Sequence, residues 1–299
     1  LGNLSTEFAV HGDRQSTKPA LNMGVSEIHT HSEIFRAGMP HLDIFGLSES
    51  FCLSNAGNHH WSLISKLTEK LPTEWTNSQG DRVYASFVYT SVTYFRDFSV
   101  SEDDMIRTEC AARSLQAPFL ITETNYINSN SDIVATVRLM STFSATNGNS
   151  NNKFIKSAIE FHSDSFGATI YDSTRKRCRE LRQHDDTGLS KMREHTINPS
   201  VDFNAANFMY FANYCQIFKR YECPRLSSTA PVQTREIGYF GNVDPFETVT
   251  IFALQDNMSV TSAMVRSSDD KCIARSYCRN YADQSEASLT LPVINAKAG

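Results

Sequence analysis

A repeated order of elements constrains the fold of this chain more than any other feature of its sequence. An apolar helical pattern over residues 48–67 is followed by four strand-like runs, and a second pattern over residues 204–221 is followed by four more. These runs are rich in β-branched and aromatic residues and are separated by Asn-, Asp- and Ser-rich turns. They cover residues 82–94, 105–115, 118–127 and 132–143, then 232–240, 247–254, 258–267 and 271–281.

A helix followed by an antiparallel meander can bury its apolar face by lying across the concave side of a curved sheet. This arrangement is a hot dog fold, and two copies that pair edge to edge would remove two exposed sheet edges. The sequence therefore predicts an α+β chain with a double hot dog fold, two tandem helix-plus-antiparallel-sheet repeats forming a pseudo-dimer. A parallel α/β fold would need helices between the strands, and a pure β-sandwich would leave the two helices unexplained.

Composition shifts suggest the domain boundaries. We expect an N-terminal extension or linker over residues 1–37, a first hot dog over 38–145, a connecting segment over 146–193 and a second hot dog over 194–299. Residues 153–195 are locally basic, which is typical of a solvated connection. The alternative is a landing site for phosphate, either a coenzyme A tail or the phosphopantetheine and acidic surface of a carrier protein.

Charge and cysteine usage exclude several classes of function. The chain has 28 Lys and Arg against 33 Asp and Glu, a net charge of −5, which argues against a nucleic-acid or anionic-membrane surface. No run of about 18 apolar residues could span a bilayer. The seven cysteines form no CxxC pair, so we expect a reduced, cytoplasmic protein without a metal site. The chain has no GxSxG, GxGxxG or P-loop motif, so neither serine chemistry nor a nucleotide cofactor is expected.

Four ordered motifs resemble those of the leinamycin-type acyltransferase/decarboxylases of polyketide biosynthesis, a double hot dog family. They lie at residues 46–50 with 57–61, at 82–87, at 197–204 with 210–213, and at 239–242. The matches spread from about residue 38 to residue 281, and residues 1–37 have no counterpart. The resemblance implies an enzyme that takes methylmalonyl-coenzyme A, releases CO2 and passes the propionyl group to an acyl carrier protein. It implies no metal or organic cofactor.

The resemblance gives Tyr84 the central catalytic role. A phenol could be acylated as a nucleophile, but its pKa near 10 makes it a poor one without a base beside it. We therefore favour a hydrogen-bond donor to the thioester oxygen, where negative charge collects as CO2 leaves. The alternative is a packed strand tyrosine, since Tyr89 and Tyr94 lie in the same run.

His59 and His60 form a polar pair in the middle of the first predicted helix. Adjacent helical residues do not share a face, so we expect only one of them to face the sheet. His60 is the candidate general acid that protonates the enolate, and His59 a candidate substrate-binding residue. The alternative for both is a helix surface or a satisfied core histidine, and their spacing does not suit a metal.

Asp202, Asn204 and Asn242 complete the predicted substrate-binding set. Asp202 and Asn204 are expected at the start of the second helix, where Asp202 could act as the N-cap. By the resemblance, Asn204 and Asn242 would hold a thioester carbonyl or a departing carboxylate with their amide groups. His60 and Asp202 could instead be the histidine–acid pair of a dehydratase, although the surrounding motifs differ from those of dehydratases.

The leading functional hypothesis is decarboxylative acyl transfer from an α-carboxyacyl-coenzyme A, with methylmalonyl favoured, to an acyl carrier protein. Dehydration or thioester hydrolysis of a carrier-bound chain is the first alternative, and a non-catalytic acyl-carrier docking module the second. The two halves are expected to be asymmetric, because the second-half run that aligns with Tyr84 contains Glu236, Ile237 and Gly238, and the sequence leaves open one site or two. The sequence leaves open a homodimer or a place in a larger synthase.

Overall fold

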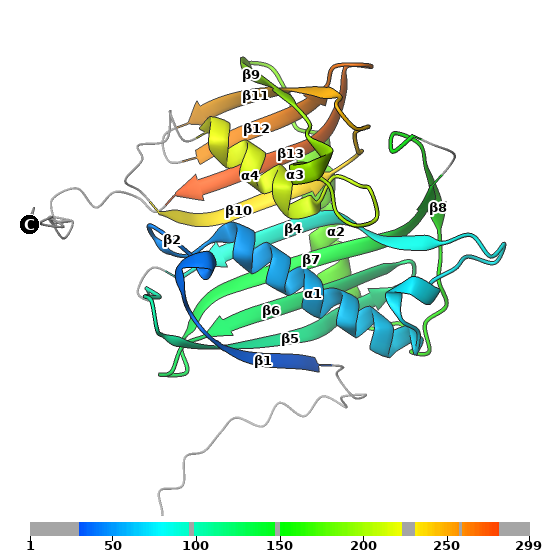
Figure 1. The fold of residues 1–299 in the computed structure, drawn as a ribbon, viewed down its shortest axis with the longest axis vertical. Coiled ribbons are helices and arrows are strands. Elements are labelled where there is room, and N and C mark those ends of the chain that lie inside the picture. The colour runs from blue at the N-terminus through cyan, green and yellow to red at the C-terminus, as the bar shows by residue number, and fades with distance from the viewer. Residues whose placement is uncertain (1–29, 96–98, 147–149, 223–230, 257–258, 281–299) are drawn as a thin grey trace, which may run out of the picture.

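One curved antiparallel sheet of eleven strands carries the fold of this computed structural model, which describes residues 30–95, 99–146, 150–222, 231–256 and 259–280 (Figure 1). The two helices predicted from the sequence are α1 (Glu49–Thr68) and α4 (Phe211–Glu222), and both lie on the same face of the sheet. The strands are β1 (Thr30–Arg36), β4 (Val83–Tyr94), β5 (Met105–Gln116), β6 (Phe119–Ile127), β7 (Ile133–Thr146), β8 (Phe154–Ser157), β9 (Ser190–Thr196), β10 (Val232–Tyr239), β11 (Thr248–Asp256), β12 (Ser259–Arg266) and β13 (Lys271–Asn280). Shorter elements are β2 (Leu42–Asp43), β3 (Gly46–Leu47), α3 (Pro199–Asp202) and the 3-10 turns η1 (Met39–His41) and η2 (Pro72–Glu74).

The strand order shows an internal pseudo-twofold repeat. The order β1-β5-β6-β7-β4 in the first half continues as β10-β13-β12-β11-β9 in the second. Each half is therefore a strand, a helix and four further antiparallel strands, with β4 and β10 antiparallel at the junction. Only the last three of these four strands form a meander, because β4 pairs with β7 and β10 with β13 instead of with the next strand along the chain. The predicted helix and four strands of each half are all present. Among the described strands of the large sheet, β8 alone has no counterpart, and it extends the sheet beside the end of β7.

The first strand of each half was not predicted. β1 lies within the proposed N-terminal extension, whose residues 1–29 are outside the described part, and β9 crosses the proposed boundary at residue 193. Both are edge strands, and most of their side chains are exposed. They therefore lack the alternation of apolar residues that reveals a half-buried strand.

The predicted connecting segment contains a further helix, α2 (Ala168–Arg182), which lies on the sheet face opposite α1 and α4 (Figure 1). Ile170, Cys178 and Leu181 pack there against Tyr89 and Met140. The helix contacts β4, β10 and β13, so it crosses the junction between the halves. The dense basic charge of this segment concealed a helical spacing of its apolar residues.

The second long helix begins later than the sequence predicted. Residues 204–210 form a loop closed by a bridge between Phe203 and Met209, and α4 starts at Phe211. Asn204 shapes this loop, because its Oδ1 accepts hydrogen bonds from the backbone N–H groups of Ala206 and Phe208, 3.0 and 3.1 Å away. A side chain that binds nearby backbone groups in this way favours a turn over a helix.

A buried cluster of charges joins the halves at one end of the junction. Glu49, in the first turn of α1, lies 2.7 Å from the Arg235 guanidinium on β10. Arg235 also reaches Glu222 of α4 at 2.6 Å, and Lys219 of α4 reaches Glu49 at 2.9 Å. Burial raises the pKa of the Glu49 carboxyl, but the charges of Arg235 and Lys219 outweigh this and hold it below its usual range.

Replacing Arg235 with alanine is expected to lower the free energy of unfolding by about 3–5 kcal/mol, because two buried carboxylates would lose their shared partner. The matched control is Arg36→Ala, which removes an exposed ion pair with Asp103 and should cost no more than about 1 kcal/mol. Urea denaturation at pH 7 compares the two. Equal losses would contradict a structural role for the buried cluster.

Candidate functional site

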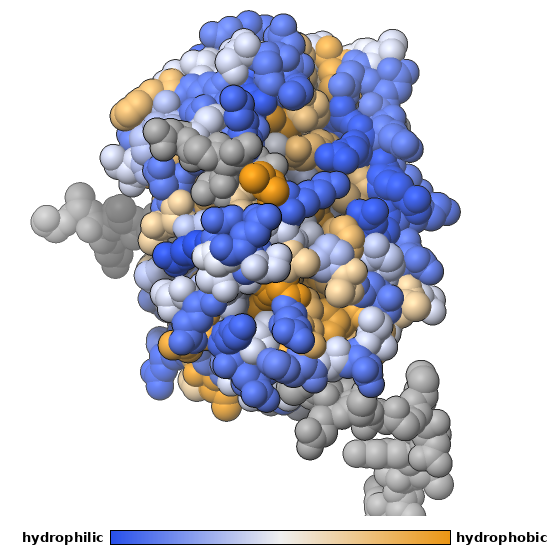
Figure 2. Space-filling model, turned by 90° about the vertical axis from the view of Figure 1, so that its right-hand side faces the viewer, coloured by the Kyte–Doolittle hydropathy of each residue, from blue (hydrophilic) through white to orange (hydrophobic). Residues whose placement is uncertain are grey.

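A cavity of about 740 Å³ lies where the two halves of the sheet separate. The last pair between β4 and β10 is Tyr89 with Gly238, and β4 extends beyond it over residues 83–88. That free edge of β4, the loop 204–209 before α4 and residues 239–242 after β10 form the walls. Figure 2 shows the molecule from the side on which β8 lies in Figure 1, with apolar surface set between hydrophilic groups.

The cavity reaches both faces of β4. Val83 and Phe87 point to the α1 side, where they join the buried core. Tyr84 and Ser86, at the alternate positions, point to the opposite face, the one that α2 covers further along the strand. Since all four residues line the cavity, it bends around the free edge of the strand.

Three aromatic rings close the cavity on the α1 side. Phe211 lies with its ring centre 4.2 Å from that of Phe87 and 6.3 Å from that of Trp61. Gly57 of α1 leaves the space that the Phe211 ring occupies, because a Cβ at this position would come within 2.9 Å of that ring. We call Trp61, Phe87 and Phe211 the aromatic floor.

Tyr84 lies half-buried on the other side of the free edge. Its ring meets Phe208 edge-on at 5.0 Å, and the Arg82 guanidinium lies 5.1 Å from its ring centre. These two contacts fix the ring between the halves, because Phe208 belongs to the loop before α4. The phenol thus lies in the wall of the cavity, rather than in a closed core.

Asn204 and Asn242 line the same cavity from the second half. The Oδ1 of Asn242 accepts hydrogen bonds from the backbone N–H groups of Val243 and Met209, 2.8 and 3.3 Å away. Both asparagines thus use their oxygens to shape the walls. Within the described part of the chain, neither Nδ2 has a hydrogen-bond partner, so each amide can donate to a ligand.

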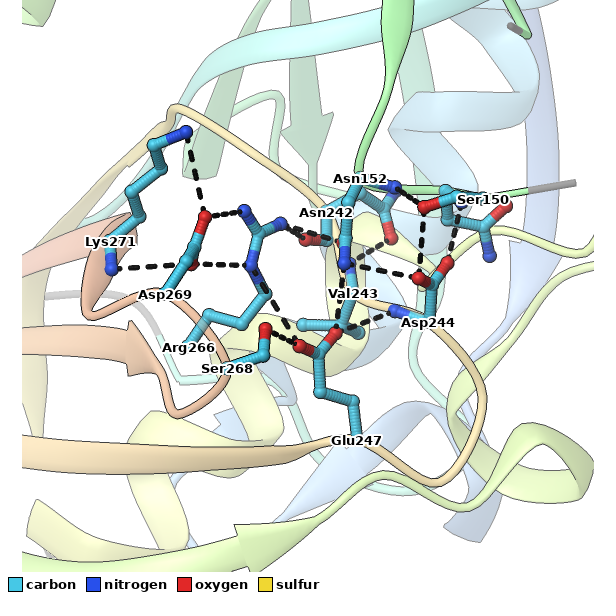
Figure 3. A network of polar contacts seen from close by, with 11 residues as sticks. Ser150, Asn152, Asn242, Val243, Asp244, Glu247, Arg266, Ser268, Asp269 and Lys271 are labelled. Atoms are coloured by element: carbon cyan, nitrogen blue, oxygen red, sulfur yellow. Dashed lines mark hydrogen bonds and ion pairs between the residues drawn. The ribbon is translucent and has the colours of Figure 1, made fainter. Parts of the chain in front are cut away.

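A polar network holds Asn242 in place (Figure 3). Arg266 donates to the backbone oxygen of Asn242 and to Oδ1 of Asn152, both at 2.6 Å, and pairs with Asp269. The carboxylate of Asp244, two residues after Asn242, accepts hydrogen bonds from Ser150, Asn152 and the backbone of Asn151. The segment after β7 thereby fixes the loop after β10. Asn151 also donates to the backbone oxygen of Asn207, in the loop before α4, at 2.7 Å.

The structure places His60 and His59 away from the cavity. His60 is fully buried, with Nδ1 2.7 Å from Thr122 Oγ1 and Nε2 2.8 Å from Ser141 Oγ. Burial lowers its pKa to about 3, so the ring is neutral at pH 7. His59 faces β5, where its Nε2 lies 3.1 Å from Thr108 Oγ1. Burial, and secondarily the charge of His31, lower its pKa to about 4.

Both histidines contact the sheet, contrary to the expectation that only one would. The curved sheet wraps around α1, so residues about 100° apart on the helix both meet strands. Neither histidine can protonate a ligand in the cavity from where it lies.

Asp202 does not line the cavity either, and it does not cap α4. It ends the short helix α3, accepts a hydrogen bond from the backbone N–H of Asn198 at 2.8 Å and lies 3.7 Å from His195 Nε2. The proposed pairing of His60 with Asp202 is therefore not formed. Of the six predicted site residues, the structure brings together Tyr84, Asn204 and Asn242.

The charged groups in the cavity wall are all cations. Arg82, Lys156 and Arg182 line it, and among the described residues no Asp, Glu, His or Cys does. Arg182 comes from the basic segment considered for phosphate, whereas Arg177 in that segment pairs with Glu236 at 2.7 Å. Sequence reasoning missed Arg82 and Lys156 as wall residues. The signal for Arg82 was its place two residues before Tyr84.

The buried histidines predict a sensitivity to acid. Because the unfolded chain binds a proton at His60 near pH 6.5 and the folded chain only near 3, folding stability should fall as pH drops below about 6.5. His60→Gln should reduce this slope by up to about 1.4 kcal/mol per pH unit. Urea denaturation at pH 7, 6 and 5 measures it. His184→Gln, at an exposed site, serves as the control, and equal slopes for both variants would contradict the prediction.

Among the described helices, none has the length and apolar character needed to cross a membrane. Nor does any group of three or more His, Cys, Asp or Glu within the described ranges come together as around a metal ion.

Comparisons with known proteins show similarity in structure but not in sequence. No protein-family model and no curated protein matches the sequence. The chain is similar to an acyl-ACP thioesterase from Bacteroides thetaiotaomicron, with a TM-score of 0.61 and 11% identity over 84% of this chain and 97% of that one. A 12:0-ACP thioesterase from Umbellularia californica matches with a TM-score of 0.64 and 10% identity, over 84% and 96% of the two chains. A MaoC-like dehydratase from Phytophthora capsici matches at 0.50 and 12%, over 86% and 96%. Together with the repeated helix and sheet, these matches show that the chain has the double hot dog fold predicted from its sequence.

Proposed function

We propose that this chain is an enzyme acting on an acyl thioester in the cavity at the junction, and that its reaction is decarboxylative acyl transfer. The substrate would be an α-carboxyacyl-coenzyme A, methylmalonyl-coenzyme A by the sequence resemblance, and the acceptor an acyl carrier protein. One observation carries this choice of reaction: the described cavity wall offers hydrogen-bond donors and cations, but no carboxylate, imidazole or thiol to act as a base.

Loss of CO2 needs an electron sink rather than a base. The bond between the α-carbon and the carboxylate breaks, CO2 leaves, and the electron pair moves onto the thioester oxygen as an enolate. The Tyr84 hydroxyl and the Nδ2 groups of Asn204 and Asn242 are donors that can stabilise this oxygen. The α-carbon then takes a proton from water. In the transfer step the thiol of the carrier protein loses its proton to water and attacks the thioester carbonyl as the thiolate, and coenzyme A leaves as a thiolate that takes a proton back from water.

The aromatic floor supports the same reaction. It offers an apolar surface to the short acyl group and keeps water from one side of the reacting carbon. Exclusion of water strengthens hydrogen bonds to the developing enolate and weakens the solvation of the carboxylate. Since the carboxylate loses its charge as CO2 leaves, weaker solvation of the carboxylate favours the reaction.

Thioester hydrolysis or dehydration is the second candidate, and the fold similarity to acyl-ACP thioesterases and a MaoC-like dehydratase supports it. Either reaction needs a group that activates water or removes a proton. The two proposed members of such a pair, His60 and Asp202, face other partners. We therefore rank this candidate below decarboxylative transfer.

Intact-protein mass spectrometry of an acyl carrier protein, incubated with this chain and methylmalonyl-coenzyme A, tests the proposal. We expect a propionyl mass on the carrier and a loss of about 10²–10³ in rate for Tyr84→Phe, the usual cost of removing one such donor. Tyr171→Phe, on α2 where the ring packs against Phe119 and does not line the cavity, is the matched control and should keep the rate. Malonyl-coenzyme A in the same assay reports the preference for the acyl group.

Each other outcome of that assay points elsewhere. A methylmalonyl mass would mean simple transfer without decarboxylation. Free acid with an unmodified carrier would favour hydrolysis, and no reaction with any coenzyme A ester would leave the dehydratase and the non-catalytic docking module.

The aromatic floor predicts how acyl length can be changed. Phe211→Ala should open space toward α1 and lower the KM for longer α-carboxyacyl thioesters relative to methylmalonyl, at a stability cost of about 3–5 kcal/mol. Gly57→Ala should push the Phe211 ring into the cavity and act in the opposite direction. Phe51→Ala, in an aromatic group outside the cavity, is the control for stability alone. An unchanged order of KM values in both cavity variants would contradict this role.

A further inference from the structure

A row of hydroxyl groups lines the cavity on the face of β4 away from α1. Tyr84 on β4 is paired with Ser144 on β7, and Ser86 with Thr142, so these four side chains share one face. All four line the cavity. Within the described chain, the hydroxyls of Ser86, Thr142 and Ser144 make no hydrogen bond to protein. Their donors are free for a ligand rich in oxygen.

Three cations surround this hydroxyl row. Lys156 is the register partner of Ser144 on the other side of β7, Arg82 lies over the Tyr84 ring, and Arg182 lies 4.9 Å from the Phe240 ring centre. All three are exposed, and in the described part of the chain none forms an ion pair. Together they place three positive charges in the cavity wall of a chain whose net charge is −5, and no described residue adds a negative charge there.

The strand that carries Lys156 is an addition to the repeat. β8 pairs with the last residues of β7, which β6 does not reach. No described strand of the second half corresponds to β8. The fold does not need β8 to close the sheet around its helices. Its position beside Ser144 therefore points to a role in the cavity.

We propose that the hydroxyl row with Lys156, Arg82 and Arg182 binds the phosphate at the end of the substrate's pantetheine arm. This rests on the proposed function, since it places the thioester at Tyr84, Asn204 and Asn242. Cations and hydroxyl donors around one point are the groups that bind phosphate oxygens. Coenzyme A and a carrier protein both present a phosphate on this arm, so one site would serve donor and acceptor in turn.

Binding of pantetheine derivatives tests the proposal without any reaction. Both tryptophans of the chain, Trp61 and Trp75, line the cavity, so their fluorescence can report occupancy. We expect 4′-phosphopantetheine to bind at least about tenfold more tightly than pantetheine, as a charge-assisted hydrogen bond to phosphate predicts. Coenzyme A and dephospho-coenzyme A separate the phosphate of the arm from the 3′-phosphate of the nucleotide.

Lys156→Ala should remove most of the advantage of 4′-phosphopantetheine over pantetheine and leave pantetheine binding unchanged. Lys153→Ala, an exposed lysine three residues earlier that does not line the cavity, is the matched control. Equal binding of the two ligands by the unaltered protein, or an advantage that survives in both Lys156→Ala and Arg182→Ala, would overturn the proposal. So would a preference for coenzyme A that depends on the 3′-phosphate alone.

Failure of the proposed function gives a different result. If the phosphate advantage holds and depends on Lys156, but no coenzyme A ester reacts in the mass-spectrometric assay, the phosphate site stands and the reaction is wrong. If propionyl transfer occurs with equal KM values for phosphorylated and unphosphorylated thioesters, the reaction stands and the phosphate site is wrong.

Discussion

Antiparallel pairing of β4 with β10 is the interaction on which the rest of the structure depends. It makes one sheet from the two half-sheets, so neither half presents a bare edge at the junction, and it brings α1 and α4 together on one face. Five residue pairs, from Thr93–Thr234 to Tyr89–Gly238, form this contact. Because β4 is longer than the paired region, its other end stays free, and the cavity lies along that free edge.

The two ends of the junction are equivalent by the repeat but differ in chemistry. The pseudo-twofold repeat relates α1 to α4 and β4 to β10. Under this relation, the region that corresponds to the cavity at the other end of the junction is that of Glu49, Arg235, Lys219 and Glu222. There ion pairs lie between the described elements, whereas the cavity is open and bordered by cations that form no ion pair with the described residues. The same fold therefore uses one end of its junction for cohesion and leaves a cavity at the other.

Sequence reasoning predicted the repeat, both central helices and eight of the strands, because their apolar periodicity reports burial directly. It failed at β1, β9 and α2, where most side chains are exposed or charged and the periodicity is weak. Motif resemblance pointed to Tyr84, Asn204 and Asn242, and the fold brings these three to the wall of one cavity from distant positions. His60 was misplaced because a polar residue on a helix looks the same in sequence whether it faces a ligand or two buried hydroxyls. Lys156 depends on the register of β8, which is set by the tertiary structure.

The presence of both halves in one chain has a consequence for how the site could arise. Two separate subunits must hold together at their cellular concentration, so both ends of their interface have to contribute to affinity. A covalent connection fixes a high effective concentration of one half beside the other, whatever the abundance of the protein. In a symmetric dimer every substitution appears at both ends of the interface, whereas in a single chain it appears in one half only. One end can then lose its contacts to make room for a ligand without risk of dissociation, while charged residues accumulate at the other.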